Sequence, residues 1–76
     1  MGAVEMPQLT PVNSSNLRAV GYLVGTATLW VEFQNGHLYR YPNVPVGAHR
    51  ALMSAASMGS YFTRRIKPVY QGQRMR

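Results

Sequence analysis

The sequence contains neither cysteine nor aspartate among its 76 residues, and it has few acidic side chains of any kind. Without cysteine it forms no disulfide scaffold and no thiolate zinc site, which suits a reducing cytoplasm. The only carboxylates, Glu5 and Glu32, exclude a paired-carboxylate or two-metal catalytic site. His37 and His49 lack zinc-site spacing, so surface or capping roles are expected. We therefore expect a cytoplasmic protein that is not an enzyme and holds no cofactor or metal.

Long hydrophobic runs are also lacking. Residues 19–31 carry no charge, but this stretch is shorter than the ~20 residues a helix needs to cross a bilayer. The N-terminus has no basic region of a secretory signal. A chain of 76 residues with 46% hydrophobic residues is expected to fold as a single compact domain, without membrane contact.

Positive charge is concentrated in the second half of the chain. The net charge is +6, yet the balance up to Glu32 is negative, with Arg18 against two glutamates. The basic residues after Glu32 are Arg40, Arg50, Arg64, Arg65, Lys67, Arg74 and Arg76. Such an excess favours polyanions through counterion release and electrostatic steering. Solubility alone also explains a basic surface, and the charge pattern leaves both readings open.

Hydrophobic periodicity predicts an α+β fold. Three strands are expected at residues 17–23, 28–33 and 37–41, forming a small antiparallel β-meander. A main helix from Pro45 to Ser57 is expected to cover one face of the sheet. A second short helix follows, and these elements together predict a sheet covered by two helices.

The ends of these elements are predicted from individual residues. Gly59 is expected to end the main helix in a left-handed conformation, and Ser60 to cap the second helix. Pro68 ends the second helix, whose Phe62 and Ile66 are expected to face inward. The domain is expected at residues 12–70, between a flexible leader at residues 1–11 and a frayed basic tail at residues 71–76.

The turn at residues 34–36 sets the register of the second and third strands. A three-residue loop with Gly36 left-handed pairs Phe33 with His37, Val31 with Tyr39 and Leu29 with Tyr41. This register collects aromatic and branched residues on the helix-covered face. The other, open face then carries Gly21, Leu23, Thr28, Trp30, Glu32, Leu38 and Arg40.

The order of these motifs resembles the KTSC domain family, named for its occurrence at the C-terminus of some lysyl-tRNA synthetases. The resemblance spans residues 12–70, and the family's central Tyr-x-Tyr falls on Tyr39 and Tyr41. Further matching segments are Val12–Ser15, Val20–Tyr22, Leu29–Phe33, Asn35–Gly36, Val44–Pro45, Ala55–Ser57, Gly59, Tyr61–Phe62 and Ile66. Stand-alone members occur in bacteria and phages, and the resemblance implies RNA binding through the family's fusion to a tRNA-handling enzyme.

Aromatic residues on the two faces allow different interpretations. Tyr39 and Tyr41 could stack on bases, but paired aromatics on a covered face are favoured as core. Trp30, opposite Gly21 and beside Arg40, is the better stacking candidate. It could equally pack beneath the leader or a second subunit. We expect partial exposure of Trp30.

Two function hypotheses follow from these patterns. The first is a noncatalytic accessory domain that binds RNA or another polyanion through a basic face. Its candidate binding residues are Trp30, Arg40, Tyr61, Arg64, Arg65 and Lys67. The second is a protein-interaction module, a small bacterial or phage regulator that binds an acidic partner and modulates a larger host protein. A homodimer through the open sheet face is a further expectation.

Overall fold

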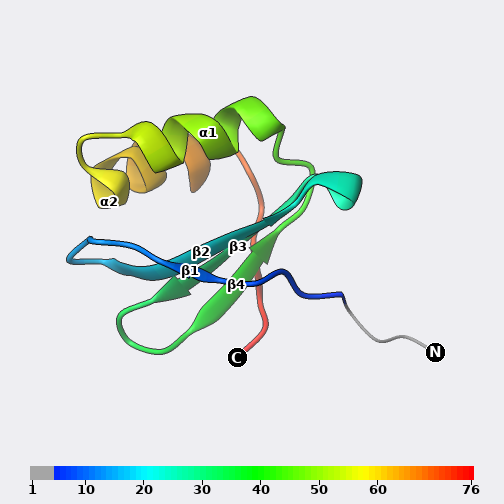
Figure 1. Cartoon of the computed structure of the whole chain (residues 1–76), viewed down its shortest axis with the longest axis horizontal. Coiled ribbons are helices and arrows are strands. Elements are labelled where there is room, and N and C mark those ends of the chain that lie inside the picture. The colour runs from blue at the N-terminus through cyan, green and yellow to red at the C-terminus, as the bar shows by residue number, and fades with distance from the viewer. Residues whose placement is uncertain (1–4) are drawn as a thin grey trace.

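The computed structural model describes residues 5–76 and shows an antiparallel sheet of five strands in the order β1-β2-β3-β4-β5. The strands are β1 (Thr10–Pro11), β2 (Leu17–Leu23), β3 (Thr28–Phe33), β4 (Leu38–Tyr41) and β5 (Gln73–Arg74). The helical segments are the 3₁₀ turn η1 (Val24–Thr26), α1 (Val46–Ser54), α2 (Met58–Tyr61) and the π-helix η2 (Phe62–Ile66). The helices form a layer over one face of the sheet (Figure 1), which confirms the α+β class.

Strands β1 and β5 extend the predicted meander at both edges. Thr10 pairs with Val20 on one edge, and Gln73 pairs with Arg40 on the other. The predictions of a loose leader and a frayed tail are therefore wrong at these strands, while residues 1–4 of the predicted leader lie outside the described residues. Unpaired backbone groups at a sheet edge need partners, and even two-residue strands supply them.

The predicted register of β3 and β4 is confirmed. Val31 pairs with Tyr39 and Leu29 with Tyr41, and the Phe33 amide donates to the His37 carbonyl at 2.9 Å. Gly36 has a φ of 91°, a left-handed conformation that favours glycine. The expected position of Gly21 opposite Trp30 is also confirmed.

The boundary between α1 and α2 differs from the prediction. Helix α1 begins after Pro45 as expected but ends at Ser54, and Ala55 is already extended. Ser57, not Ser60, is the N-cap of α2, and its hydroxyl accepts a hydrogen bond from the Ser60 amide. None of the helices in residues 5–76 is long and apolar enough to span a bilayer.

Gly59 lies inside α2 and does not end a helix in the left-handed conformation. A Cβ placed there would lie 3.3 Å from the Ser14 hydroxyl oxygen, which is a tight contact. The glycine therefore lets the loop before β2 pack closely against α2. The sequence predicted a glycine with a special backbone conformation, but its value here is its lack of a side chain.

The helix-covered face of the sheet contains the main hydrophobic core. Its buried members are Leu17, Val20, Leu29, Val31, Tyr41, Val44, Leu52, Phe62 and Ile66. The inward orientation predicted for Phe62 and Ile66 is confirmed, as is the core position of Tyr41. Tyr39 is half-buried and packs against the edge of the same cluster.

The opposite face is covered as well, so the prediction of an open apolar face is wrong. Trp30 is only 2% exposed and Leu38 only 3%. A Cβ added at Gly21, the residue opposite Trp30, would lie 2.8 Å from Pro7 Cγ, which shows how closely the N-terminal segment lies on this face. The expected partial exposure of Trp30 is contradicted, and Trp30 and Leu38, two apolar residues of the face predicted to form a homodimer, are buried within the chain.

Candidate nucleic-acid interface

The basic residues of the second helical region lie on the outer side of η2. Phe62 and Ile66 are buried and fix this helix on the core, so Arg64 and Arg65 between them face solvent. Lys67 follows directly, is also exposed, and its amide donates to the Phe62 carbonyl at 2.9 Å in the i to i+5 pattern of a π-helix. The anchoring of η2 thus leaves three neighbouring cations exposed to solvent.

These cations have no acidic partner among residues 5–76. Both ion pairs in this part of the chain involve Glu32, which contacts Arg76 at 2.8 Å and Arg18 at 3.9 Å. The charge of the η2 residues is therefore not neutralised locally. An uncompensated basic cluster attracts phosphate groups more strongly than the same residues in ion pairs would.

Hydroxyl groups surround the basic cluster. Arg64 borders two shallow hollows, one shared with the loop at residues 13–16 and one shared with Arg65 and Tyr61. Ser57 and Ser60 contribute to both hollows. Hydroxyl and guanidinium donors together are the groups that commonly contact a phosphate backbone. Tyr61 was predicted to point outward, but it is half-buried against the core.

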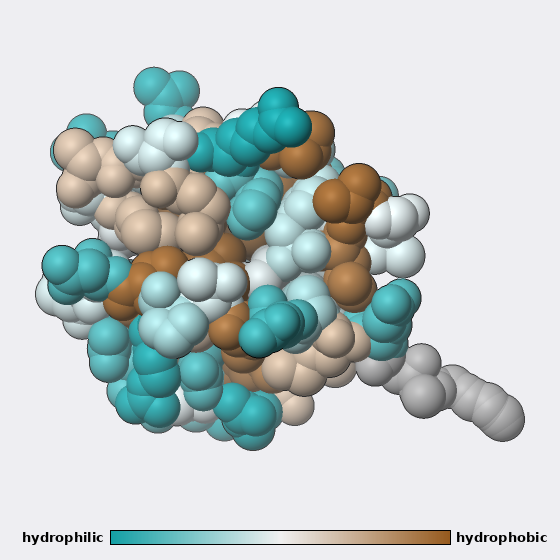
Figure 2. Space-filling view, viewed as in Figure 1, coloured by the Kyte–Doolittle hydropathy of each residue, from teal (hydrophilic) through white to brown (hydrophobic). Residues whose placement is uncertain are grey.

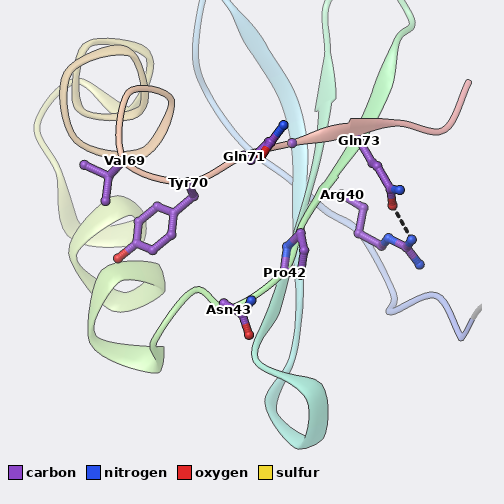
Figure 3. Close-up of a pocket in the computed structure, with 8 residues that line it drawn as sticks. Arg40, Pro42, Asn43, Val69, Tyr70, Gln71 and Gln73 are labelled. Atoms are coloured by element: carbon purple, nitrogen blue, oxygen red, sulfur yellow. Dashed lines mark hydrogen bonds between the residues drawn. The ribbon is translucent and has the colours of Figure 1, made fainter.

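The six predicted binding residues separate into two groups in the structure. Arg40 lies on the same sheet face as Trp30, with its guanidinium carbon 6.0 Å from the Trp30 ring centroid. Figure 3 shows the Arg40 side chain turned toward Gln73 of β5, to which it donates a hydrogen bond, and away from Tyr70. Trp30 and Arg40 therefore pack on the sheet face opposite the helices, which we call the second face. The other four residues, Tyr61, Arg64, Arg65 and Lys67, belong to the helical layer.

An aromatic groove beside η2 was not predicted as a site. Its rings come from Phe33, Tyr39, Tyr41 and Phe62, and its polar margin includes Lys67. The strand register predicts that the rings of Phe33, Tyr39 and Tyr41 share one face, but the accessibility of these rings depends on how η2 packs, which has no local sequence signal. Burial, together with the neighbouring Tyr39, raises the pKa of Tyr41 to about 12, so its phenol stays protonated at neutral pH.

Comparison with known proteins gives a family assignment. The KTSC domain family model matches residues 13–70. An uncharacterized protein from Stutzerimonas stutzeri is 44% identical over 57 residues, covering 75% of this chain and 80% of that protein. A lysine–tRNA ligase from Nostoc sp. is 33% identical over 95% of this chain, but the match covers only 13% of the ligase.

A solved structure supports the same assignment. The crystal structure of a KTSC domain protein from Yersinia pestis matches with a TM-score of 0.87 and 33% identity, covering 93% of this chain and all of that one. The Tyr-x-Tyr at Tyr39 and Tyr41 lies at the centre of the matched region. The family match and the shared fold lead to one conclusion: the chain belongs to the KTSC domain family.

Proposed function

We propose that this protein is a noncatalytic accessory domain that binds RNA through the η2 basic cluster, which consists of Arg64, Arg65 and Lys67. The observation that carries the proposal is that all three are exposed and none has a carboxylate partner within residues 5–76. The similar segment of the Nostoc lysine–tRNA ligase, an enzyme that by its name acts on tRNA, adds support.

The small size of the cluster limits the affinity. Three neutralised phosphates give a slope of about −2 in a plot of log affinity against log salt for single-stranded RNA. Binding should therefore be micromolar and fall about twenty-fold between about 50 and 200 mM salt. Affinity for RNA that stays constant over this range would contradict the proposal.

A pair of charge-matched variants tests the location of the binding surface. The double variant R64Q/R65Q removes two η2 cations, and R50Q/R74Q removes two exposed cations elsewhere, so both change the net charge equally. Fluorescence anisotropy with a labelled single-stranded RNA should show that R64Q/R65Q lowers the salt slope by about 1.4, whereas R50Q/R74Q nearly preserves it. Equal losses in both variants would mean that only overall charge matters.

A separate observation favours the protein-interaction hypothesis as the second candidate. Val24 is 74% exposed, and Val46 and Met53 border the same groove as Arg50. Figure 2 shows hydrophobic residues gathered where η1 approaches the start of α1. An apolar surface flanked by a cation suits an acidic protein partner. Pull-down from lysate with and without nuclease separates the candidates, because RNA-mediated partners are lost on nuclease treatment and direct protein partners are retained.

A further inference from the structure

We infer that the aromatic groove between the β3–β4 hairpin and η2 accepts one nucleobase, and that Lys67 at its margin binds the adjoining phosphate. This inference rests on the proposed RNA-binding function and names the unit that the protein recognises. It concerns a surface separate from Trp30, which sequence reasoning had selected for stacking.

The aromatic rings form a continuous surface. Phe33 contacts Tyr39 and Phe62, with ring centroids 5.6 and 5.4 Å apart, and Tyr41 contacts the same two rings at 6.2 and 5.5 Å. Tyr41 and Phe62 are buried beneath, while Phe33 and Tyr39 are only half-buried. Their accessible ring surface lies in a concavity, and such surfaces stack bases irrespective of sequence.

Polar groups at the margin can contact the edge of a base. The side-chain oxygen Oδ1 of Asn35 accepts a hydrogen bond from the His37 backbone amide at 3.0 Å, which leaves the side-chain NH2 group of Asn35 free to donate. Within residues 5–76, the hydroxyls of Tyr39 and Tyr41 form no hydrogen bond to another group of the protein. These groups offer both donors and acceptors, as base recognition in single-stranded RNA requires.

Charge and size restrict the occupant further. Lys67 lines the groove and belongs to the η2 basic cluster, so the groove is continuous with the proposed phosphate-binding surface. The groove volume is about 270 Å³. This value is just below the range of roughly 300–1,000 Å³ for small-molecule pockets, which favours a single nucleotide over a larger group.

The larger pocket beside Arg40, about 620 Å³, is a weaker candidate. In Figure 3 its only aromatic side chain, Tyr70, lies at one end, while Arg40 is engaged with Gln73 at the other. Its polar groups are spread apart, so no ring and free cation converge on one ligand. The aromatic groove beside η2 brings both together.

Titration with adenosine 5′-monophosphate and with adenosine tests the inference directly. NMR amide shifts should map to residues 33–41 and 62–67 of the folded protein, and the monophosphate should bind more tightly than the nucleoside. Lys67→Gln, at an exposed position, should remove that difference without changing nucleoside binding. Shifts that map elsewhere, or an equal response of Lys67→Gln and the parent to the monophosphate, would overturn the assignment.

Ring variants test stacking with single-stranded RNA. Tyr39→Leu should weaken binding about ten-fold to a hundred-fold, Tyr39→Phe much less, and Tyr70→Leu, the matched control in the other pocket, hardly at all. If folded Tyr39→Leu binds RNA like the parent, the groove is not the base site even though R64Q/R65Q still weakens binding. If no RNA binds at any salt concentration, the proposed function is wrong. The mononucleotide titration then still shows separately whether the aromatic groove binds a nucleotide.

Discussion

The two faces of the sheet are buried by different means. On one face, α1 and η2 cover the core with Leu52, Phe62 and Ile66. On the other face, the N-terminal segment before β1 lies against Gly21, the residue paired with Trp30, while β1 and β5 extend the sheet at its edges. Phe62 and Trp30, one on each face, are both only 2% exposed. Equal burial can therefore come from a periodic helix or from short irregular segments, and only the helix has a sequence pattern.

The second face also contains buried polar atoms that lack hydrogen-bond partners. Among residues 5–76, neither the Trp30 indole nitrogen nor Arg40 Nε has a hydrogen-bond partner, although both atoms are buried. A buried donor without an acceptor costs about 1–3 kcal/mol. The attraction between the Arg40 guanidinium and the Trp30 ring offsets about 1 kcal/mol of that cost. We expect this face to open before the helix-covered one.

The largest expected effect is at Trp30. Trp30→Ala should lower the free energy of unfolding by ~3–5 kcal/mol, because it removes a large side chain that is 2% exposed. Urea unfolding followed by circular dichroism measures the loss, and Val24→Ala, at a 74% exposed position, is the control. The parent should show blue-shifted tryptophan emission. Red-shifted emission with a stable mutant would show that the second face is open.

Gly21→Ala tests whether the N-terminal segment covers the second face, and its expected effect on stability is smaller. The new Cβ would lie 2.8 Å from Pro7 Cγ and 2.9 Å from Leu9 Cδ2, so the N-terminal segment must move. We expect a loss of ~1–3 kcal/mol and a red shift of Trp30 emission as the cover withdraws. Gly25→Ala, with no atom within 4 Å of the new Cβ, is the matched control. Unchanged emission in Gly21→Ala would mean that the segment does not cover Trp30.

The smallest effect concerns pH on the helix side. His49 of α1 stacks on Tyr22, with centroids 4.7 Å apart, and burial followed by Arg50 lowers the pKa of the imidazole. Because the folded state favours neutral His49, this residue contributes stability to the fold above the ordinary histidine pKa of about 6.5. That stability is lost as pH falls through the lower pKa of the folded state. Urea unfolding at several pH values should show this decline, and His49→Gln should reduce it. An identical pH dependence in both proteins would contradict the lowered pKa.

The strand pairing was predictable because its signals are local. Gly36 and the alternation around it are sufficient to align Val31 with Tyr39, since a slip by one residue would place charge in the core. The end of α1 was not predictable in this way. Ser57 and Ser60 are both competent caps, and the close packing of the 13–16 loop on Gly59 accompanies the choice of Ser57.

The sequence by itself determined the α+β class, the hairpin register and the outward position of Arg64, Arg65 and Lys67, because periodicity and turn chemistry act over a few residues. The tertiary structure alone decided that Trp30 is buried and that the rings beside Tyr39 line a groove next to η2. These features depend on contacts between segments far apart in the chain, such as the leader against β2 and η2 against the hairpin. No local pattern encodes such contacts, because each segment satisfies its own propensities whichever partner it meets.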